Sequence, residues 1–98
     1  MRIIVVDGDK NALAGSVSSV RETVPGASVT GFDIHEEALE YCRNSLVDVA
    51  ILNIGPADKD GIGYAKKIRA LLPSCNVIFY RGQPRVRRVF SARVRLRP

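Results

Sequence analysis

The chain of 98 residues has few of the side chains that build soft-metal sites or disulfide frameworks: two cysteines, one histidine and no tryptophan. Cys42 and Cys75 lack metal-ligand spacing, and no secretory signal accompanies them, so we expect two reduced, packed thiols. His35 has no serine or cysteine partner in the sequence, and we expect it at the surface in the first turn of a helix. The chain also lacks a glycine-rich loop of the dinucleotide-binding or P-loop type.

Long apolar runs are absent as well. The chain has no run of about 18 apolar residues, so we expect no transmembrane helix and no membrane partner. Its N-terminus, Met-Arg-Ile-Ile-Val-Val-Asp, places an acid at Asp7. An acid at that position interrupts the apolar core that a signal peptide needs and favours a strand. We therefore expect a cytoplasmic protein.

Acidic side chains are missing from one end of the chain. Residues 1–80 hold eight Lys/Arg and ten Asp/Glu, whereas residues 81–98 hold seven arginines and no acid. An asymmetry this sharp indicates a compositional boundary near residues 80 and 81. We expect one mildly acidic domain at 1–80, long enough for a modest core, followed by an arginine-rich tail at 81–98.

Strand and helix signals alternate along residues 2–80. Short runs rich in branched apolar residues predict parallel strands at 2–6, 27–32, 47–53 and 75–80. Helical periodicity predicts a helix in each interval between them. The inward stripes of these helices would be Leu13, Val17, Val20 and Val24; Ala38, Leu39 and Cys42; and Ile62, Ala65, Ile68 and Leu72. The alternation predicts an α/β three-layer sandwich built of right-handed βαβ units.

Polar residues mark where the predicted helices begin. Asp9 can cap the first helix, because its carboxylate can accept the free N–H groups of the first turn. Asp33, followed three residues later by Glu36, has the spacing of a capping box for the second helix. Asp60 and Gly61 open the third helix.

Three predicted strands end in polar residues: Asp7-Gly8-Asp9, Asn53 and Arg81. The carboxyl ends of parallel strands lie on one edge of a sheet, where ligands bind. Asp7 and Asp9 would form an acidic pocket there, and Asp7 is a candidate ligand for a hard cation such as Mg²⁺. A strand stop and a helix cap explain the same two acids without any ligand.

In order and spacing, residues 2–80 resemble a response-regulator receiver domain. The likeness rests on the strand leading to Asp7, the strand 49–52 leading to Asn53, and Asp60-Gly61 beyond it. Residues 31–32, 37–40, 47–50 and 65–69 look most like receivers attached to LytTR-type DNA-binding domains. The resemblance implies a flavodoxin-like (CheY-like) fold with strand order 2-1-3-4, in which the fifth strand is missing or replaced by the tail.

Receivers pass a phosphoryl group from a histidine kinase to an aspartate that ends the third strand, with Mg²⁺ held by an acidic pair after the first strand. Asp7 matches the first acid of that pair, and Gly8 stands in place of the second. Asn53 falls at the phosphoacceptor and Arg81 at the Thr/Ser switch position. An amide cannot form the acyl phosphate of this mechanism. The resemblance therefore implies a signalling module that is not phosphorylated in the usual way, needs no cofactor and binds a histidine kinase or another signalling protein.

Two other interpretations assign chemistry to nearby acids. Asp58 and Asp60 are the only nearby substitute acceptors, and a capping role is enough to explain both. Asp7-Gly8-Asp9 also resembles the first motif of haloacid-dehalogenase-type phosphotransferases, in which the first Asp is the nucleophile and the second the general acid. That motif continues with Gly-Thr, whereas Lys10-Asn11 follows here. We therefore expect no enzyme.

The arginine tail leaves three interpretations open. It would bind nucleic acid through phosphates as a basic arm, or remain solvated and disordered. We favour a third, a frameshift: residues 85–87 and 92–97 admit codons that read, one base later, as Glu-Tyr-Ala and His-Ala-Ser-Gly-Tyr, segments typical of LytTR-type receivers after the fourth strand. The fourth strand would then be an exposed edge that promotes self-association.

Overall fold

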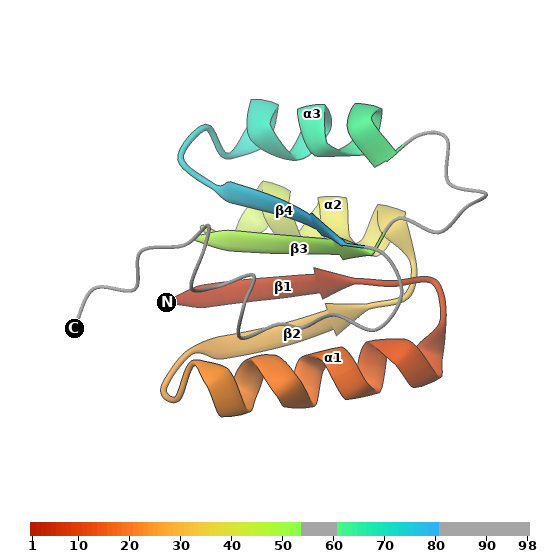
Figure 1. The fold of residues 1–98 in the computed structure, drawn as a ribbon. Helices are drawn as coiled ribbons and strands as arrows, with labels where there is room; N and C mark the ends of the chain where they lie inside the picture. Colours follow the sequence, from red (N-terminus) through yellow and green to blue (C-terminus); the bar gives the residue numbers. More distant parts are fainter. Residues whose placement is uncertain (54–60, 81–98) are drawn as a thin grey trace.

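The computed structural model describes residues 1–53 and 61–80, which fold into a parallel sheet flanked by helices (Figure 1). The strands are β1 (Arg2–Val6), β2 (Ser28–Phe32), β3 (Val49–Asn53) and β4 (Asn76–Tyr80), and the helices are α1 (Lys10–Thr23), α2 (His35–Asn44) and α3 (Gly61–Leu71). The strand order is β2-β1-β3-β4, which confirms the predicted order. Asp58, Asp60, Arg81 and the tail lie outside the described residues, so what we predicted for them stays a prediction.

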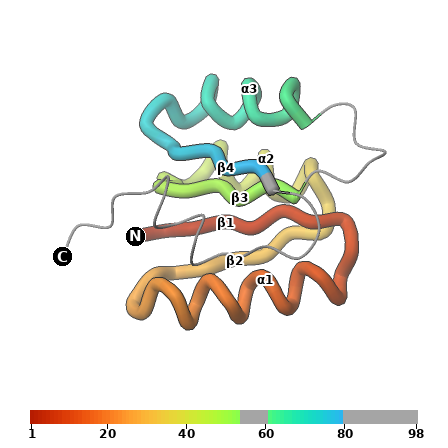
Figure 2. The backbone as a smooth tube through the Cα atoms, in the orientation of Figure 1, coloured from red at the N-terminus to blue at the C-terminus, as the bar shows by residue number. Residues whose placement is uncertain are grey.

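Helices cover both faces of the sheet, as Figures 1 and 2 show. Because side chains alternate along a strand, each strand contributes to two separate cores. The α1 side packs Val20 against Ile3, Val5, Val29, Val49, Ile51 and Ile78. The α2 and α3 side packs Ala38, Leu39, Cys42, Ala65 and Ile68 against Ile4, Val6, Ala50, Leu52 and Val77. The predicted three-layer sandwich is confirmed.

β1 and β3 lie at the centre of the sheet and are apolar on both faces. Residues 3–6 of β1 are at most 1% exposed, which explains why the sequence there is continuously apolar instead of alternating. β1 pairs with β2 and β3, and Val6 lies opposite both Phe32 and Leu52. The residues that follow Val6 and Leu52 therefore emerge side by side at the carboxyl edge of the sheet.

At the opposite edge, Asp48 connects the starts of three strands. Its backbone N–H donates to the carbonyl oxygen of Arg2 over 2.8 Å, and its own carbonyl accepts the N–H of Asn76 over 2.9 Å. Its carboxylate Oδ2 also accepts the backbone N–H of Arg2 over 2.7 Å. The amino ends of β1, β3 and β4 are thus aligned through one residue.

Helix α1 begins and packs as its sequence predicts. The Asp9 carboxylate accepts the backbone N–H groups of Asn11 and Ala12 over 2.9 and 3.1 Å, which confirms it as the N-cap. α1 crosses β2 so closely that a Cβ added at Gly31 would lie 2.8 Å from Cγ2 of Val17. Only glycine fits this crossing without a shift of its neighbours.

The prediction that Asp33 caps α2 is wrong. The helix begins at His35, its N-cap is Ile34, and no side chain caps it. Asp33 lies one position too early, and its carboxylate instead pairs with the Lys10 ammonium at 3.7 Å. Glu36 and Glu37 in the first turn offset the missing cap by favourable interaction with the helix dipole.

The prediction that Ile62 faces the core is also wrong, since this side chain is 68% exposed. The buried line of α3 begins at Gly61 and continues through Ala65 and Ile68 to Leu72, just after the helix. Successive helical residues are rotated by about 100°, so Ile62 points roughly a quarter turn away from that line.

Other predictions hold. Cys42 and Cys75 are free thiols and both are buried. His35 is exposed at the first position of α2. In the described part of the chain, no helix is long and apolar enough to cross a membrane.

Candidate functional site

Asp7 and Asn53 meet at the carboxyl edge of the sheet, as the sequence predicts. Asp7 follows β1 and is only 4% exposed, and Asn53 is the half-buried last residue of β3. The Nδ2 amide of Asn53 donates a hydrogen bond to Oδ2 of Asp7 over 2.6 Å. The two central strands are thereby joined through side chains just beyond their last paired residues.

The second oxygen of the Asp7 carboxylate is occupied as well. Oδ1 accepts the backbone N–H of Asp9 over 2.9 Å. A buried carboxylate is costly unless its oxygens find donors, and here one donor comes from the following loop and one from Asn53. The backbone N–H of Asp7 in turn donates to the carbonyl of Phe32 over 3.0 Å, which fixes the residue to β2.

The carboxylate of Asp9 serves as a helix cap. Its carboxylate oxygen Oδ1 accepts the first N–H groups of α1, and the residue is exposed. Lys10, next in the chain, pairs with Asp33 at the end of β2, and its side chain is 86% exposed. Each of the three acids at this edge therefore has its own donors.

Gly8 lies between Asp7 and Asp9 in the chain. Apart from those two neighbours, no atom lies within 4 Å of a Cβ built at Gly8, and its backbone does not require a positive φ. A carboxylate side chain would therefore fit at this position. The described residues therefore supply no packing reason for a glycine at this position.

The described residues do not fit a magnesium site. Mg²⁺ needs oxygen ligands, yet Oδ2 of Asp7 accepts a hydrogen bond from the N–H of Asn53, and an N–H group cannot bind a cation. In residues 1–53 and 61–80, no three His, Cys, Asp or Glu side chains gather in a position to hold a metal. The charge of the Asp7 carboxylate is balanced by hydrogen-bond donors instead.

Comparison with known proteins identifies the fold. No family model matches the chain, and no curated protein matches it. Among solved structures, the receiver domain of NtrC4 from Aquifex aeolicus matches with a TM-score of 0.69 and 24% sequence identity, covering 93% of this chain and 74% of that one. The chain has the receiver fold. An identity this low establishes architecture only, so the function of this receiver fold has to be argued from its own site.

Sequence reasoning placed Asp7 and Asn53 correctly but missed two other contacts. One is the Lys10–Asp33 pair, which a Lys directly after the cap of α1 and an Asp directly after β2 would have indicated once the strand order was known. The other is the hydrogen bond from the Tyr64 hydroxyl to the carbonyl of His35 over 2.7 Å. No local pattern signals this second bond, because it joins two residues that lie 29 positions apart in the chain and belong to different helices.

Proposed function

We propose that this chain is a receiver-like signalling module of a two-component response regulator that cannot be phosphorylated, because Asn53 stands in place of the acceptor aspartate at the end of its third strand. One observation carries the proposal: the position at the end of β3 holds an amide, and that amide is hydrogen-bonded to the buried Asp7 carboxylate. The match to a receiver structure supports the comparison of this position with the phosphoacceptor that ends the third strand of receivers.

The chemistry of the two side chains supports this reading. Phosphoryl transfer to a receiver needs a carboxylate oxygen that attacks phosphorus while the donor's bond to phosphorus breaks, which is a P–N bond in a phosphohistidine and a P–O bond in acetyl phosphate. The Asn53 amide is a far weaker nucleophile, and its N–H is committed to Asp7. The N–H also satisfies Asp7 without a metal ion, so the edge of the sheet is stable in an unphosphorylated state.

A module of this kind acts through protein contacts. We propose that its partner is a histidine kinase or another signalling protein in the cytoplasm, and that the chain is a degenerate and truncated relative of LytTR-type receivers. The residue segments that suggested this type, at 31–32, 37–40, 47–50 and 65–69, support it.

The proposal is tested by incubating the full chain with acetyl phosphate and Mg²⁺ and measuring its mass. We expect no phosphoryl adduct. An adduct that is lost in base or hydroxylamine would reveal an acyl phosphate, and mapping it to Asp7, Asp58 or Asp60 would refute the proposal. A receiver with an intact acceptor serves as the positive control.

The sequence suggests two further roles, and each can be tested separately from the signalling role. Seven arginines in residues 81–98 support phosphate-mediated DNA binding, which would give a salt-dependent gel shift that disappears when residues 83–98 are deleted.

A phosphotransferase that uses Asp7 and Asp9 would hydrolyse phosphate esters in the presence of Mg²⁺ and lose that activity in Asp7→Asn. The cap formed by Asp9 supports a structural role for that acid instead.

Self-association through β4 is a third separable property. In the described residues, β4 pairs with β3 and with no other strand. An unpaired edge of this kind is a template for strand pairing between copies. A variant with a restored fifth βα unit would sediment as a smaller species if this edge joins copies in solution.

A further inference from the structure

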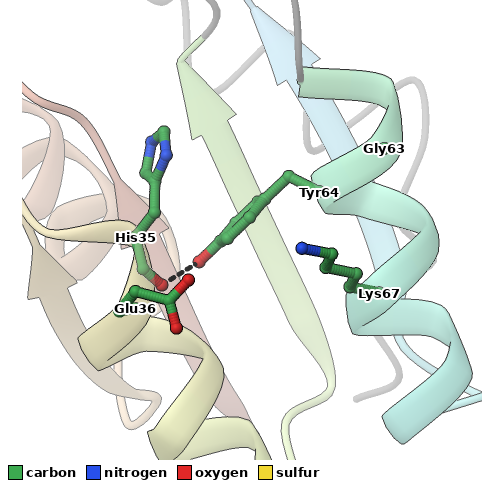
Figure 3. A pocket seen from close by; sticks show the side chains of 5 residues that line it. All are labelled: His35, Glu36, Gly63, Tyr64 and Lys67. Carbon is green, nitrogen blue, oxygen red and sulfur yellow. Dashed lines mark hydrogen bonds between the residues drawn. The ribbon is translucent and has the colours of Figure 1, made fainter.

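A cleft of about 470 Å³ lies between the amino-terminal halves of α2 and α3. It is lined by His35, Glu36, Gly63, Tyr64 and Lys67, and Figure 3 shows the side chains of Glu36, Tyr64 and Lys67 converging on it from the two helices. The cleft lies on the face of the sheet that α2 and α3 cover, and neither Asp7 nor Asn53 lines it.

The two helices that form the cleft are fixed relative to one another. The Tyr64 hydroxyl of α3 donates to the His35 carbonyl of α2 over 2.7 Å, and the centroids of the two rings lie 4.7 Å apart. Burial raises the pKa of the Tyr64 hydroxyl, so the donor proton is retained at neutral pH. A surface that is ordered before binding loses less entropy when a partner docks.

The exposed faces of the two helices carry opposite charge. On α2, Glu40 is already paired with Arg43 at 2.8 Å, which lowers the pKa of its carboxyl. Glu36 and Glu37 make no ion pair with any other described residue. On α3 the exposed charges are all basic: Lys66, Lys67 and Arg69. The two ion pairs found among the described residues use none of these three cations.

Apolar surface is exposed beside the cleft. Ile34 directly precedes His35, and Ile62 directly precedes Gly63. The two isoleucines are 51% and 68% exposed. Exposed large apolar side chains next to unpaired charges of both signs are typical of a protein-binding surface and not of a small-molecule pocket.

We propose that this face binds a second copy of the chain, with Glu36 of each copy opposite Lys67 of the other. An acidic helix beside a basic helix is self-complementary: a two-fold axis parallel to the helices lays α2 of one copy on α3 of the other, and the reverse. Both contacts are then attractive, whereas any pairing of like helices is repulsive. The inference is independent of the phosphorylation state proposed above and uses a different surface from the edge of β4.

Charge reversal tests this arrangement on the full chain by sedimentation velocity in low salt. Glu36→Lys alone and Lys67→Glu alone each turn two attractions into two repulsions, and we expect each to weaken self-association by about tenfold or more. An equimolar mixture of the two variants restores both pairs, so we expect it to associate like the unmodified chain. The Glu36→Lys/Lys67→Glu double variant should associate as well.

Glu22→Lys is the matched control, because Glu22 is exposed on α1, on the opposite face of the sheet, and undergoes the same charge change. We expect it to associate normally. The proposal is overturned if the unmodified chain is a monomer at millimolar concentration, if the single reversals associate normally, if the mixture stays as weak as its components, or if Glu22→Lys weakens association equally. Rescue in the mixture also excludes misfolding of either variant as the cause.

Discussion

Asn53 donates its side-chain N–H to Oδ2 of Asp7 over 2.6 Å, across the carboxyl ends of the two central strands. The contact joins residues 46 positions apart in the chain. The acid and the amide attract one another, whereas two acids at this distance would repel.

Asn53→Asp should therefore destabilise the fold. A second carboxylate would face Asp7 at the same short distance, and we expect the free energy of unfolding to fall by about 1–3 kcal/mol at pH 7 without divalent cations. Urea denaturation measures the change. The double variant Asp7→Asn/Asn53→Asp exchanges the two groups and should regain most of the loss. A double variant no more stable than Asn53→Asp would show that repulsion is not the cause.

Adding the acid that Gly8 lacks should create a magnesium site. We expect Gly8→Asp/Asn53→Asp to bind Mg²⁺ at millimolar concentration, because carboxylates would then stand at positions 7, 8 and 53 and a Cβ at position 8 meets no atom beyond its chain neighbours. Binding to the native state alone raises the melting temperature, which a thermal scan detects. The control Gly8→Asn/Asn53→Asp should gain less. An equal melting temperature with and without Mg²⁺ would contradict the prediction.

The hydroxyl of Tyr64 should contribute measurably to stability. Tyr64→Phe removes the hydrogen bond to the His35 carbonyl and should lower the free energy of unfolding by about 1 kcal/mol. Tyr41→Phe is the matched control, because the Tyr41 hydroxyl makes no hydrogen bond to a described residue, and it should change stability by less than about 0.5 kcal/mol. Equal effects of the two variants would mean that the bond between α2 and α3 carries no net energy.

Two glycines should respond to the same substitution with opposite sign. Gly31→Ala drives a methyl group into Val17 and Leu13 of α1 and should cost about 1–3 kcal/mol. Gly15→Ala lies in α1 with no atom within 4 Å of the new Cβ, and should gain up to about 1 kcal/mol through helix propensity. Chemical denaturation of both variants checks the pair. A stabilising Gly31→Ala would show that α1 and β2 are not in close contact.

The buried thiol of Cys75 should make stability fall in alkaline solution. Burial, with smaller effects from the nearby Cys42 and Asp48, raises its pKa from 9.0 to about 11. The unfolded chain loses this proton first, so the free energy of unfolding should decrease between pH 9.0 and about 11, by about 2–3 kcal/mol in all. Denaturation at several pH values measures the slope. Cys75→Ala should show a shallower slope, and an unchanged slope would assign the effect to other groups.

Elements set by local sequence pattern could be predicted, and so could the edge where the polar residues meet. Continuous apolar strands and the cap at Asp9 are local signals, and parallel connection then brings Asp7 and Asn53 together by topology alone. The receiver resemblance in the sequence also implies that Asn53 stands at the acceptor position, which stays a prediction. The hydrogen bond from the Asn53 amide to Asp7 could not be predicted, because its donor and its acceptor lie at the ends of different strands.

The two wrong predictions, the cap of α2 and the inward residue of α3, each depended on a choice between neighbouring residues. Asp33 and Glu36 fit a capping box, but α2 begins two residues after Asp33, with Ile34 as its N-cap, and the Asp33 carboxylate pairs with Lys10. Ile62 was assigned to the core by residue type, yet Gly61 takes the inward position one residue earlier. In both cases, tertiary packing decided between alternatives that local propensity left nearly equal.

The hydrogen bonds of Asp48 lie at the far end of the strands from Asp7 and Asn53. Alignment of β1, β3 and β4 is thus maintained at the amino edge, by a carboxylate and backbone groups that take no part in the carboxyl edge. These contacts do not involve the side chains of Asp7 and Asn53, so a change at the carboxyl edge leaves them in place. A lineage can therefore abandon the chemistry of such an edge while inheriting the architecture intact, and the scaffold then persists as a binding surface alone.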